Sequence, residues 1–401
     1  MDLEFADTSQ KLYICPGETA PISYSVHLAR LARMYPACQD CPLSCDAGTN
    51  SAAISRKLAQ HRDRASAELS RSLGSIRGVY LNQITRRVAH DVVGQFAQQL
   101  WEGTHRVVRT HRRERIEQWT APTVVIGYDQ RPSSPDIVTG VQDGLRVMGC
   151  DVIDLGLTTG PELQFGILHN QATSGMLVTG SGHSPSWTGF DFFDQNAQPL
   201  DISGLTVPRP GEPPRKHSRP VRWSGQHRFN PVSSEFAKRV QQHLRPARPI
   251  RIVVGAQDQI AIDHIRHVLD RLPNDDVILV PLPKRVRDIT DPEDADIRKV
   301  AETMLANSAD LGFVIDEDAR HFAVVDDEGE QITTREVAEF LDPSALPVTA
   351  PITSAAKALY GPGCITFRSQ TIQNAASLTL VHLITALSRR IGTASQLLRA
   401  Q

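Results

Sequence analysis

The chain has 401 residues, with 43 basic and 45 acidic side chains and a formal net charge of −2. This balance gives no electrostatic basis for binding nucleic acid or an anionic membrane surface. No apolar run approaches the ~18 residues of a membrane-spanning helix, and the N-terminal residues lack the basic-then-apolar pattern of a secretory signal. Apolar residues make up 40% of the chain, so we expect a cytoplasmic enzyme or binding protein with two or three globular domains.

The first segment, residues 1–72, is predicted to be a cysteine-bearing extension that ends in a helix. It contains Cys15, Cys38, Cys41 and Cys45, and in a reducing compartment such cysteines are metal ligands or thiols more often than disulfides. The Cys38-x-x-Cys41 spacing is typical of zinc knuckles, and Cys15 and Cys45 complete four thiolates, so the pattern predicts structural Zn²⁺. An iron–sulfur cluster and a loop of free thiols are the alternatives. We expect such an extension to bind a protein partner rather than to take part in catalysis.

Residues 73–206 alternate between apolar runs and segments with helical spacing. Strands are predicted at 124–127 and 151–155, with a helix at 136–148 between them. This strand–helix–strand order is typical of a parallel sheet with helices on both faces. Residues 73–206 are therefore predicted to form a first α/β/α domain.

A linker rich in proline and basic residues, 207–225, separates this domain from a second alternation of strands and helices over 226–345, as exposed interdomain segments commonly do. Residues 346–401 end in one or two predicted helices. The predicted fold class is α/β: tandem α/β/α domains with mixed, mainly parallel sheets, and a small cysteine-bearing N-terminal extension.

The first candidate site is the loop 179–189, which leaves the apolar run 175–178. Gly180 and Gly182 let the backbone approach a ligand closely, and their exposed amides suit an anion. Between them, Ser181 supplies a hydroxyl where α/β folds commonly place their chemistry. An ordinary glycine–serine turn is the alternative interpretation.

The second candidate site is the loop 316–321, which follows the buried run 312–315. Its carboxylates at Asp316 and Asp318 alternate along the chain, so their oxygens can meet at one point, as hard cations such as Mg²⁺ require. A polar turn between two strands, which acidic residues also favour, is the alternative.

Several segments in the right order resemble motifs of the α-D-phosphohexomutase family, which includes phosphoglucomutase and phosphomannomutase. Agreement among several motifs in order is far more specific than any one motif. The likeness covers roughly residues 75–345, and the predicted helices at 374–398 resemble part of the family's third domain. The matching segments are residues 75–79, 125–134, 154–157, 179–189, 316–321 and 324–329.

The resemblance implies a phosphoryl transfer to and from a sugar phosphate or sugar bisphosphate. Ser181 aligns with the family's phosphoserine, and Asp316 and Asp318 align with two ligands of its Mg²⁺. Arg77 and Arg131 align with cations near the phosphoserine. Such a reaction needs in-line positioning, a divalent cation on the phosphate oxygens and cationic donors for the spreading charge.

The acidic loop departs from the family pattern. The third metal-ligand position is Arg320, and the arginine that usually follows is His321. At about 4 Å, like unit charges cost on the order of 4 kcal/mol near a protein surface, so Arg320 opposes a bound Mg²⁺. Glu317, which replaces a glycine, could supply a compensating oxygen. Alternatively, Arg320, with His321 beside it, serves as the counter-ion of a phosphate in place of the metal.

The resemblance does not extend to the family's sugar-recognising loop or to its fourth domain. The sugar-recognising loop of the third domain has no counterpart near 361–368, and no fourth domain is found before residue 401. We therefore expect residues 346–401 to be a remnant of the third domain in a truncated, divergent member.

Two functional hypotheses follow. One is an isomerase of the phosphoglucomutase/phosphomannomutase type, with complete, weak or partial phosphotransfer through Ser181. There, His183 could act as a general acid or base because its ordinary pKa lies near neutrality, although a hydrogen-bonded loop histidine is the alternative. The other hypothesis is a catalytically inactive member that serves as a sugar-phosphate sensor or scaffold.

Overall fold

A computed structural model describes most of the chain. The residues that it describes are 12–14, 20–32, 38, 41, 43, 46, 68–109, 115–208, 212, 215–257, 259–349, 356–368 and 374–399. They divide into two compact units, one of Met1–Leu69 with Leu81–Gln83 and one of Ser70–Tyr80 with Ile84–Gln401. Within the described part of the chain, no helix combines the length and apolarity needed to cross a membrane.

The smaller unit contains a two-stranded antiparallel ladder, β1 (Leu12–Tyr13) with β2 (Ile22–Ser23), followed by α1 (Tyr24–Ala32). The rings of Tyr13 and His27 stack with centroids 4.0 Å apart. The Tyr13 hydroxyl donates a hydrogen bond of 2.6 Å to Asp46. Of the predicted zinc ligands, Cys38 and Cys41 are buried, whereas Cys15 and Cys45 lie outside the described residues.

The larger unit begins with a seven-stranded sheet whose strand order is β11-β8-β7-β9-β10-β4-β3. The pairings among β11, β8, β7 and β9 are parallel, whereas those from β9 through β10 and β4 to β3 are antiparallel. The strands are β3 (Ser70–Ser72), β4 (Ser75–Val79), β7 (Thr123–Tyr128), β8 (Asp151–Leu157), β9 (Ser174–Val178), β10 (Trp187–Phe193) and β11 (His227–Phe229).

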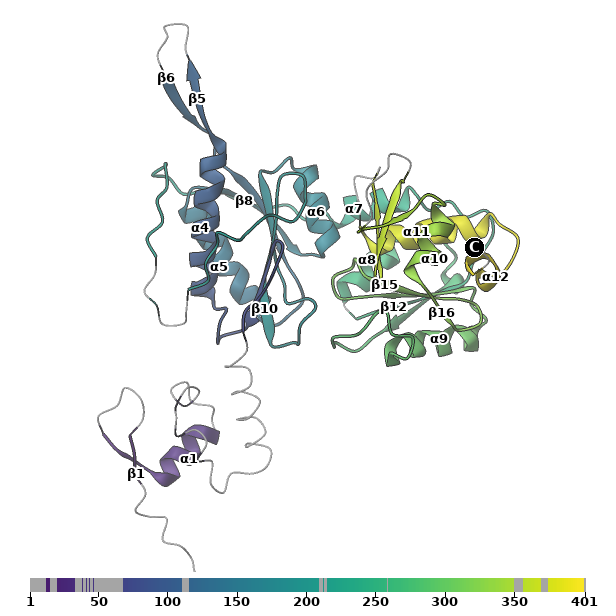
Figure 1. Ribbon diagram of the computed structural model, residues 1–401, viewed down its shortest axis with the longest axis horizontal. Helices are drawn as coiled ribbons and strands as arrows, with labels where there is room; N and C mark the ends of the chain where they lie inside the picture. The colour runs from purple at the N-terminus through teal and green to yellow at the C-terminus, as the bar shows by residue number, and fades with distance from the viewer. Residues whose placement is uncertain are drawn as a thin grey trace, which may run out of the picture. The chain divides into compact units, whose positions relative to one another are not determined.

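Helices cover both faces of this sheet (Figure 1). On one face, Leu163 and Ile167 of α6 (Gly160–His169) pack with Val125 and Leu177 of the central strands. The other face is covered by α4 (Arg86–Thr104) and α5 (Ser134–Val147), which pack closely against each other. After α4 the chain forms a hairpin of β5 (His105–Arg109) and β6 (Arg115–Trp119).

A second sheet of five strands has the order β13-β12-β14-β15-β16. Its strands are β12 (Ile252–Ala256), β13 (Val277–Pro281), β14 (Leu311–Ile315), β15 (Phe322–Val325) and β16 (Gln331–Ile332). Val253 and Val314 face α9 (Ala295–Asn307) in one apolar cluster, whereas Val254 and Phe313 face the other side in a larger one. This division follows from the alternation of side chains along a strand.

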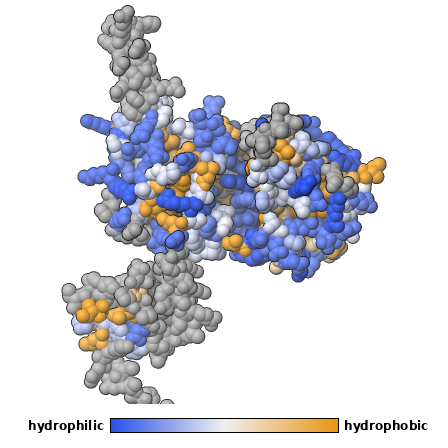
Figure 2. All heavy atoms as spheres, viewed as in Figure 1, coloured by the Kyte–Doolittle hydropathy of each residue, from blue (hydrophilic) through white to orange (hydrophobic). Residues whose placement is uncertain are grey.

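The larger cluster joins the remaining elements to the second sheet. They are α7 (Ser233–Gln241), α8 (Gln259–Val268), α10 (Thr334–Leu341), β18 (Ala358–Gly361), β19 (Cys364–Phe367), α11 (Ala376–Ser388) and α12 (Ala394–Leu398). The 3₁₀ helix η3 (Asn274–Asp276) and β17 (Leu346–Pro347) lie outside this cluster. On the face shown in Figure 2, hydrophilic residues cover most of this unit and apolar residues form small groups. Such a surface is ordinary for a folded domain.

The two sheets share one strand arrangement. In the first, β7 pairs in parallel with β8 and β9, and β9 pairs antiparallel with β10. In the second, β12 pairs in parallel with β13 and β14, and β14 pairs antiparallel with β15. The loops after β9 and β14 therefore occupy equivalent places. The predicted α/β fold class with mixed sheets is confirmed, the parallel pairings lying together in one part of each sheet.

Candidate functional site

Two loops from the two sheets line one cleft, with a volume of about 380 Å³. The Ser181 loop, residues 179–186, follows β9, and the acidic loop, residues 316–321, follows β14. Arg131, Gly180 and His183 are not among the residues that line this cleft. Among its lining residues are seven that the sequence predicted: Arg77, Ser181, Gly182, Asp316, Asp318, Arg320 and His321.

Ser181 lies half-buried in a tight turn whose backbone is tied down on both sides. Its N–H donates to Thr179 Oγ1 over 3.0 Å, and the N–H of Gly180 donates to Asp129 Oδ2 over 3.1 Å. Gly182 has φ +78°, a left-handed conformation that favours glycine. Within the described part of the chain, the Ser181 hydroxyl makes no hydrogen bond. The turn therefore holds its backbone in place and leaves the hydroxyl available in the cleft.

Arg131 joins the two loops. Its Nε and Nη2 donate to the two carboxylate oxygens of Glu317, each over 2.8 Å. Its Nη1 donates to the Ser184 carbonyl over 2.7 Å, and its Nη2 donates to the His183 carbonyl over 2.9 Å. The side chains of Arg131 and Glu317 are 9% and 11% exposed. This buried, bidentate ion pair positions the two loops relative to each other, because two parallel hydrogen bonds between a guanidinium and a carboxylate are strong and directional.

Arg77 is a second buried arginine behind the Ser181 loop. Its Nη2 lies 2.6 Å from Asp191 Oδ1, and its Nη1 donates to the Phe190 carbonyl over 2.9 Å. Among the described residues its buried Nε has no hydrogen-bond partner. Arg77 lines the cleft, and its charge is already balanced by Asp191.

His183 lies on another side of the Ser181 loop. Its ring stacks on Trp187 with centroids 4.7 Å apart, and it lines a smaller neighbouring cavity together with Arg131. Burial lowers the pKa of His183, and the nearby charges of Arg77 and Arg131 lower it further. The neutral ring is therefore favoured, and a role in acid–base catalysis stays a prediction.

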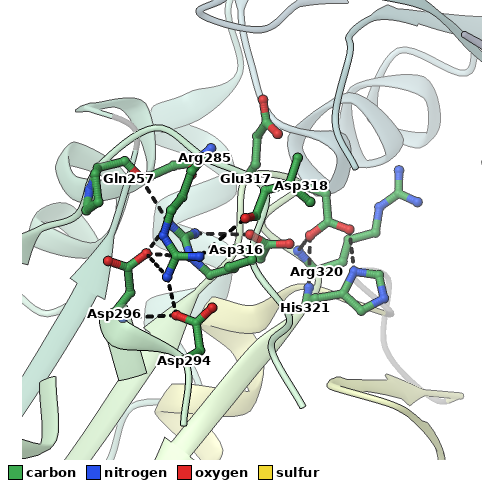
Figure 3. Close-up of polar contacts among 12 residues, drawn as sticks. Gln257, Arg285, Asp294, Asp296, Asp316, Glu317, Asp318, Arg320 and His321 are labelled. Atoms are coloured by element: carbon green, nitrogen blue, oxygen red, sulfur yellow. Dashed lines mark hydrogen bonds and ion pairs between the residues drawn. The ribbon is translucent and has the colours of Figure 1, made fainter. Parts of the chain in front are cut away.

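In the acidic loop, Asp316 faces a buried arginine that the sequence reasoning did not single out. Arg287 Nη1 donates to Asp316 Oδ1 over 3.1 Å, and the Arg287 side chain is 0% exposed. Burial raises the pKa of Asp316, as does the neighbouring Asp318, whereas Arg287 lowers it. Asp296 and Gln257, labelled in Figure 3, also accept hydrogen bonds from Arg287.

Asp318 turns toward its own loop. It accepts the backbone N–H groups of Arg320 and His321, each over 2.9 Å, and the ring Nδ1 of His321 contacts its other oxygen (Figure 3). Burial opposes ionisation of Asp318, but the bond from His321 and the charge of Arg320 hold its pKa well below the usual range. The same bond raises the pKa of His321. The two side chains thus form an ion pair.

Arg320 extends from the acidic loop toward the first sheet. Its guanidinium carbon lies 5.6 Å from the centre of the Phe193 ring. A Cβ placed on Gly160, the first residue of α6, would lie only 2.6 Å from Arg320 Nη2, so glycine makes room for this side chain. Among the described residues, the buried Nε of Arg320 has no hydrogen-bond partner. Arg320 therefore has donor capacity to spare, and unlike Arg77 it has no carboxylate partner among the described residues.

Comparisons with known proteins agree with this geometry. A family model described as phosphoglucomutase/phosphomannomutase, alpha/beta/alpha domain I, matches residues 75–204. Over 253 residues the chain is 24% identical to the phosphoglucosamine mutase of Synechococcus elongatus, covering 62% of this chain and 52% of the relative. These matches support assignment of the chain to the α-D-phosphohexomutase family.

Solved structures extend the likeness in fold. A phosphoglucomutase/phosphomannomutase family protein from Burkholderia thailandensis is 19% identical, with a TM-score of 0.63 over 82% of this chain and 78% of that one. A putative phosphomannomutase from Thermus thermophilus gives the same TM-score of 0.63 at 15% identity, over 84% and 83%. The chain spans about half the length of the curated relatives that it matches.

The acidic loop does not fit the metal that the family resemblance implied. Mg²⁺ needs oxygen ligands in near-octahedral geometry. Here the oxygens of Asp316 and Asp318 accept bonds from Arg287, His321 and the backbone. Glu317, considered above as a compensating oxygen donor, binds Arg131 instead. In the described part of the chain no three His, Cys, Asp or Glu side chains are grouped to hold a metal ion.

Sequence reasoning missed two features of the site. Arg287 stood in a charged segment between β13 and α9, and the nearby Asp294 and Asp296 were the only signal that a buried cation was needed there. Asp129 accepts both the N–H of Gly180 and, over 3.0 Å, that of Arg131. Its place within the matched motif at 125–134 was the available signal.

Proposed function

We propose that this phosphohexomutase family member binds a sugar phosphate in the cleft and that Ser181 accepts and returns its phosphoryl group. One observation carries the proposal: the Ser181 hydroxyl has no hydrogen-bond partner among the described residues and lies in a cleft that Arg77, Arg287 and Arg320 line together with several carboxylates. Support also comes from relatives whose names are phosphoglucosamine mutase and phosphoglucomutase/phosphomannomutase. A sugar phosphate is therefore the substrate class.

The phosphate would be bound by groups that the protein does not already use. The amide of Gly180 donates to Asp129, so the exposed backbone at Gly182 is the better anion donor in the turn. Arg320 and His321, whose pKa the bond to Asp318 raises, lie across the cleft. Together they supply positive charge for the equatorial oxygens of the phosphoryl group.

In the proposed step, Ser181 Oγ forms a bond to phosphorus while the bond from phosphorus to the sugar oxygen breaks. The proton of the serine hydroxyl ends on the sugar oxygen, so atoms and charge balance. The reverse step returns the phosphoryl group to a sugar hydroxyl. Positioning and electrostatic stabilisation supply most of the rate in such transfers.

The test is phosphoryl uptake from hexose 1,6-bisphosphate, followed by intact-mass and phosphopeptide analysis of the full chain. We expect one phosphoryl group on the peptide that contains Ser181, and none in Ser181→Ala. Ser184→Ala is the matched control, because Ser184 lies in the same loop but is not among the residues lining the cleft. Uptake by Ser181→Ala equal to that of the unmodified chain would overturn the assignment.

A second function, sugar-phosphate sensing or scaffolding without turnover, is favoured by a separate observation. Both aspartates of the acidic loop are bound to cations of the protein itself, Asp316 to Arg287 and Asp318 to His321. Calorimetric binding of hexose 1,6-bisphosphate without any phosphorylation of Ser181 would support this function over the first.

The sequence predicted the domain division 1–72, 73–206, 226–345 and 346–401, with 207–225 as a linker. Because β3 (Ser70–Ser72) and β11 (His227–Phe229) pair within the first sheet, we propose that the first domain includes both strands. A structural Zn²⁺ in the N-terminal extension also stays a proposal, supported by the burial of Cys38 and Cys41. Metal analysis of the purified chain by mass spectrometry tests it. Stoichiometric zinc that is lost in Cys38→Ser/Cys41→Ser is the expected result.

A further inference from the structure

The side of the cleft formed by the acidic loop contains a cation built into the protein. Arg287 is fully buried and donates to Asp316 over 3.1 Å. On its other sides it donates to Asp296 over 3.1 Å, to Gln257 over 3.0 Å and to the Pro283 carbonyl over 3.2 Å. A guanidinium with four acceptors around its planar fork is held in one orientation.

The carboxylates behind Arg287 fix it further. Asp296 is shared with Arg285, whose Nη2 lies 3.0 Å from Asp296 Oδ2 and also contacts Asp294. Figure 3 shows Arg285, Asp294 and Asp296 together on the side away from Asp318. Arg287 therefore stands between Asp296 behind it and Asp316 in front of it. Its position does not depend on a ligand.

The remaining acidic side chains of the loop are satisfied in the same way. Asp318 is paired with His321, and Glu317 is paired with Arg131. A divalent ion at this loop would have to displace these partners while lying near the charges of Arg287 and Arg320. Partly buried like charges repel strongly, and Mg²⁺ sheds its water reluctantly even where ligands are available.

We propose that Arg287 replaces the divalent cation in this family member, so that the cleft binds a phosphate monoester without a metal ion. The guanidinium neutralises Asp316 permanently, and Arg320 is left to face the phosphate. The part concerning phosphate rests on the proposed function; the part concerning the metal does not.

The direct test uses Mn²⁺ alone, titrated into the full chain and followed by electron paramagnetic resonance. We expect no Mn²⁺ signal that depends on Asp316, so the unmodified chain and Asp316→Asn should give the same titration. In Arg287→Met the partner of Asp316 is removed, and we expect a new bound-Mn²⁺ signal at millimolar metal. Arg285→Met is the matched control, because Arg285 contacts Asp294 and Asp296 but, among the described residues, has no ion pair with Asp316, and it should give no new signal.

Two outcomes would overturn the inference. One is a bound Mn²⁺ in the unmodified chain that is lost in Asp316→Asn. The other is a folded Arg287→Met, with native circular dichroism and cooperative unfolding, that binds no more Mn²⁺ than the unmodified chain. If Arg287→Met does not fold, the comparison of the unmodified chain with Asp316→Asn still decides the question.

A second measurement separates this inference from the proposed function. Phosphoryl uptake by Ser181 is compared in excess chelator and in Mg²⁺. Equal uptake supports both proposals, and uptake that requires Mg²⁺ overturns this one alone. If uptake fails under both conditions, the phosphotransfer proposal fails, while the Mn²⁺ titration still tests the role of Arg287.

Discussion

The Ser181 loop and the acidic loop follow equivalent strands, β9 and β14, of two sheets with the same local strand order. Their side chains are nevertheless used in opposite ways. In the first loop the Ser181 hydroxyl has no hydrogen-bond partner among the described residues. In the second, Asp316, Glu317 and Asp318 all bind cations of the protein.

This difference shows that a repeated backbone arrangement positions a loop without deciding its chemistry. Both loops approach the same cleft because β9 and β14 end on it. What each loop can bind then depends on its charge partners, which come from distant parts of the chain: Arg131 from before α5 and Arg287 from before α9. Function on a shared fold resides in such sites rather than in the fold.

The largest predicted effect comes from separating the two loops. Arg131→Met leaves the buried carboxylate of Glu317 without its cation, so we expect a loss of about 3 kcal/mol in the free energy of unfolding. Glu317→Gln should cost less, because the amide oxygen still accepts one hydrogen bond from Arg131. Urea denaturation of both single variants and the double variant gives the coupling energy. Equal stability of Arg131→Met and the unmodified chain would contradict the buried pairing.

A smaller effect concerns one left-handed residue in each loop, Gly182 with φ +78° and Ala319 with φ +57°. In the Ser181 loop, Gly182→Ala adds a methyl in this conformation and should cost about 1 kcal/mol. In the acidic loop, Ala319→Gly relieves the same strain but removes a partly buried methyl worth about 0.8 kcal/mol, so we expect little net change. Thermal unfolding of the two variants checks the contrast, and a loss in Ala319→Gly as large as that in Gly182→Ala would refute it.

The smallest effect contrasts one histidine in each loop. Burial and the nearby arginines hold the pKa of His183 below 6.5, whereas the bond to Asp318 raises the pKa of His321 above 6.5. His183 therefore contributes stability that is present above pH 6.5 and lost as the pH falls toward its folded pKa. His321 contributes stability that is present below pH 6.5 and lost as the pH rises through its folded pKa.

Ring titrations by nitrogen-15 NMR measure both values, and His183→Gln and His321→Gln assign the signals. We expect the titration midpoint of His183 to lie below the ordinary histidine pKa and that of His321 to lie above it. In urea unfolding at a series of pH values, each variant should lose the pH dependence of the free energy of unfolding that its histidine contributes. Two histidines titrating on the same side would show that the loops do not differ in electrostatic environment as described.

Much of the fold could be predicted from the sequence. The apolar runs at 124–127 and 311–315 are the buried strands β7 and β14, because a central parallel strand is covered on both faces. The loops after the buried strands at 175–178 and 311–315 were recognisable from small and acidic residues in those places. The family resemblance added that they belong to one site, and both do line one cleft.

The partners of those loops could not be predicted. Arg131 and Glu317 are 186 positions apart, and Arg287 and Asp316 are 29 apart. Local spacing carries no information on such pairs. The first forms only when the two sheets come together, and the second only when β13 and β14 lie in one sheet on either side of β12. The interpretation of Asp316 and Asp318 as oxygen ligands of a metal ion is consistent with the chemistry of these two residues considered alone. The cations that satisfy them come from elsewhere in the chain.

The pair of Arg131 and Glu317 has a consequence for how a ligand reaches the cleft. Because both partners are buried, the pair fixes the Ser181 loop and the acidic loop relative to each other through the fold itself. A ligand that enters the cleft therefore need not bear the entropy of ordering these two loops.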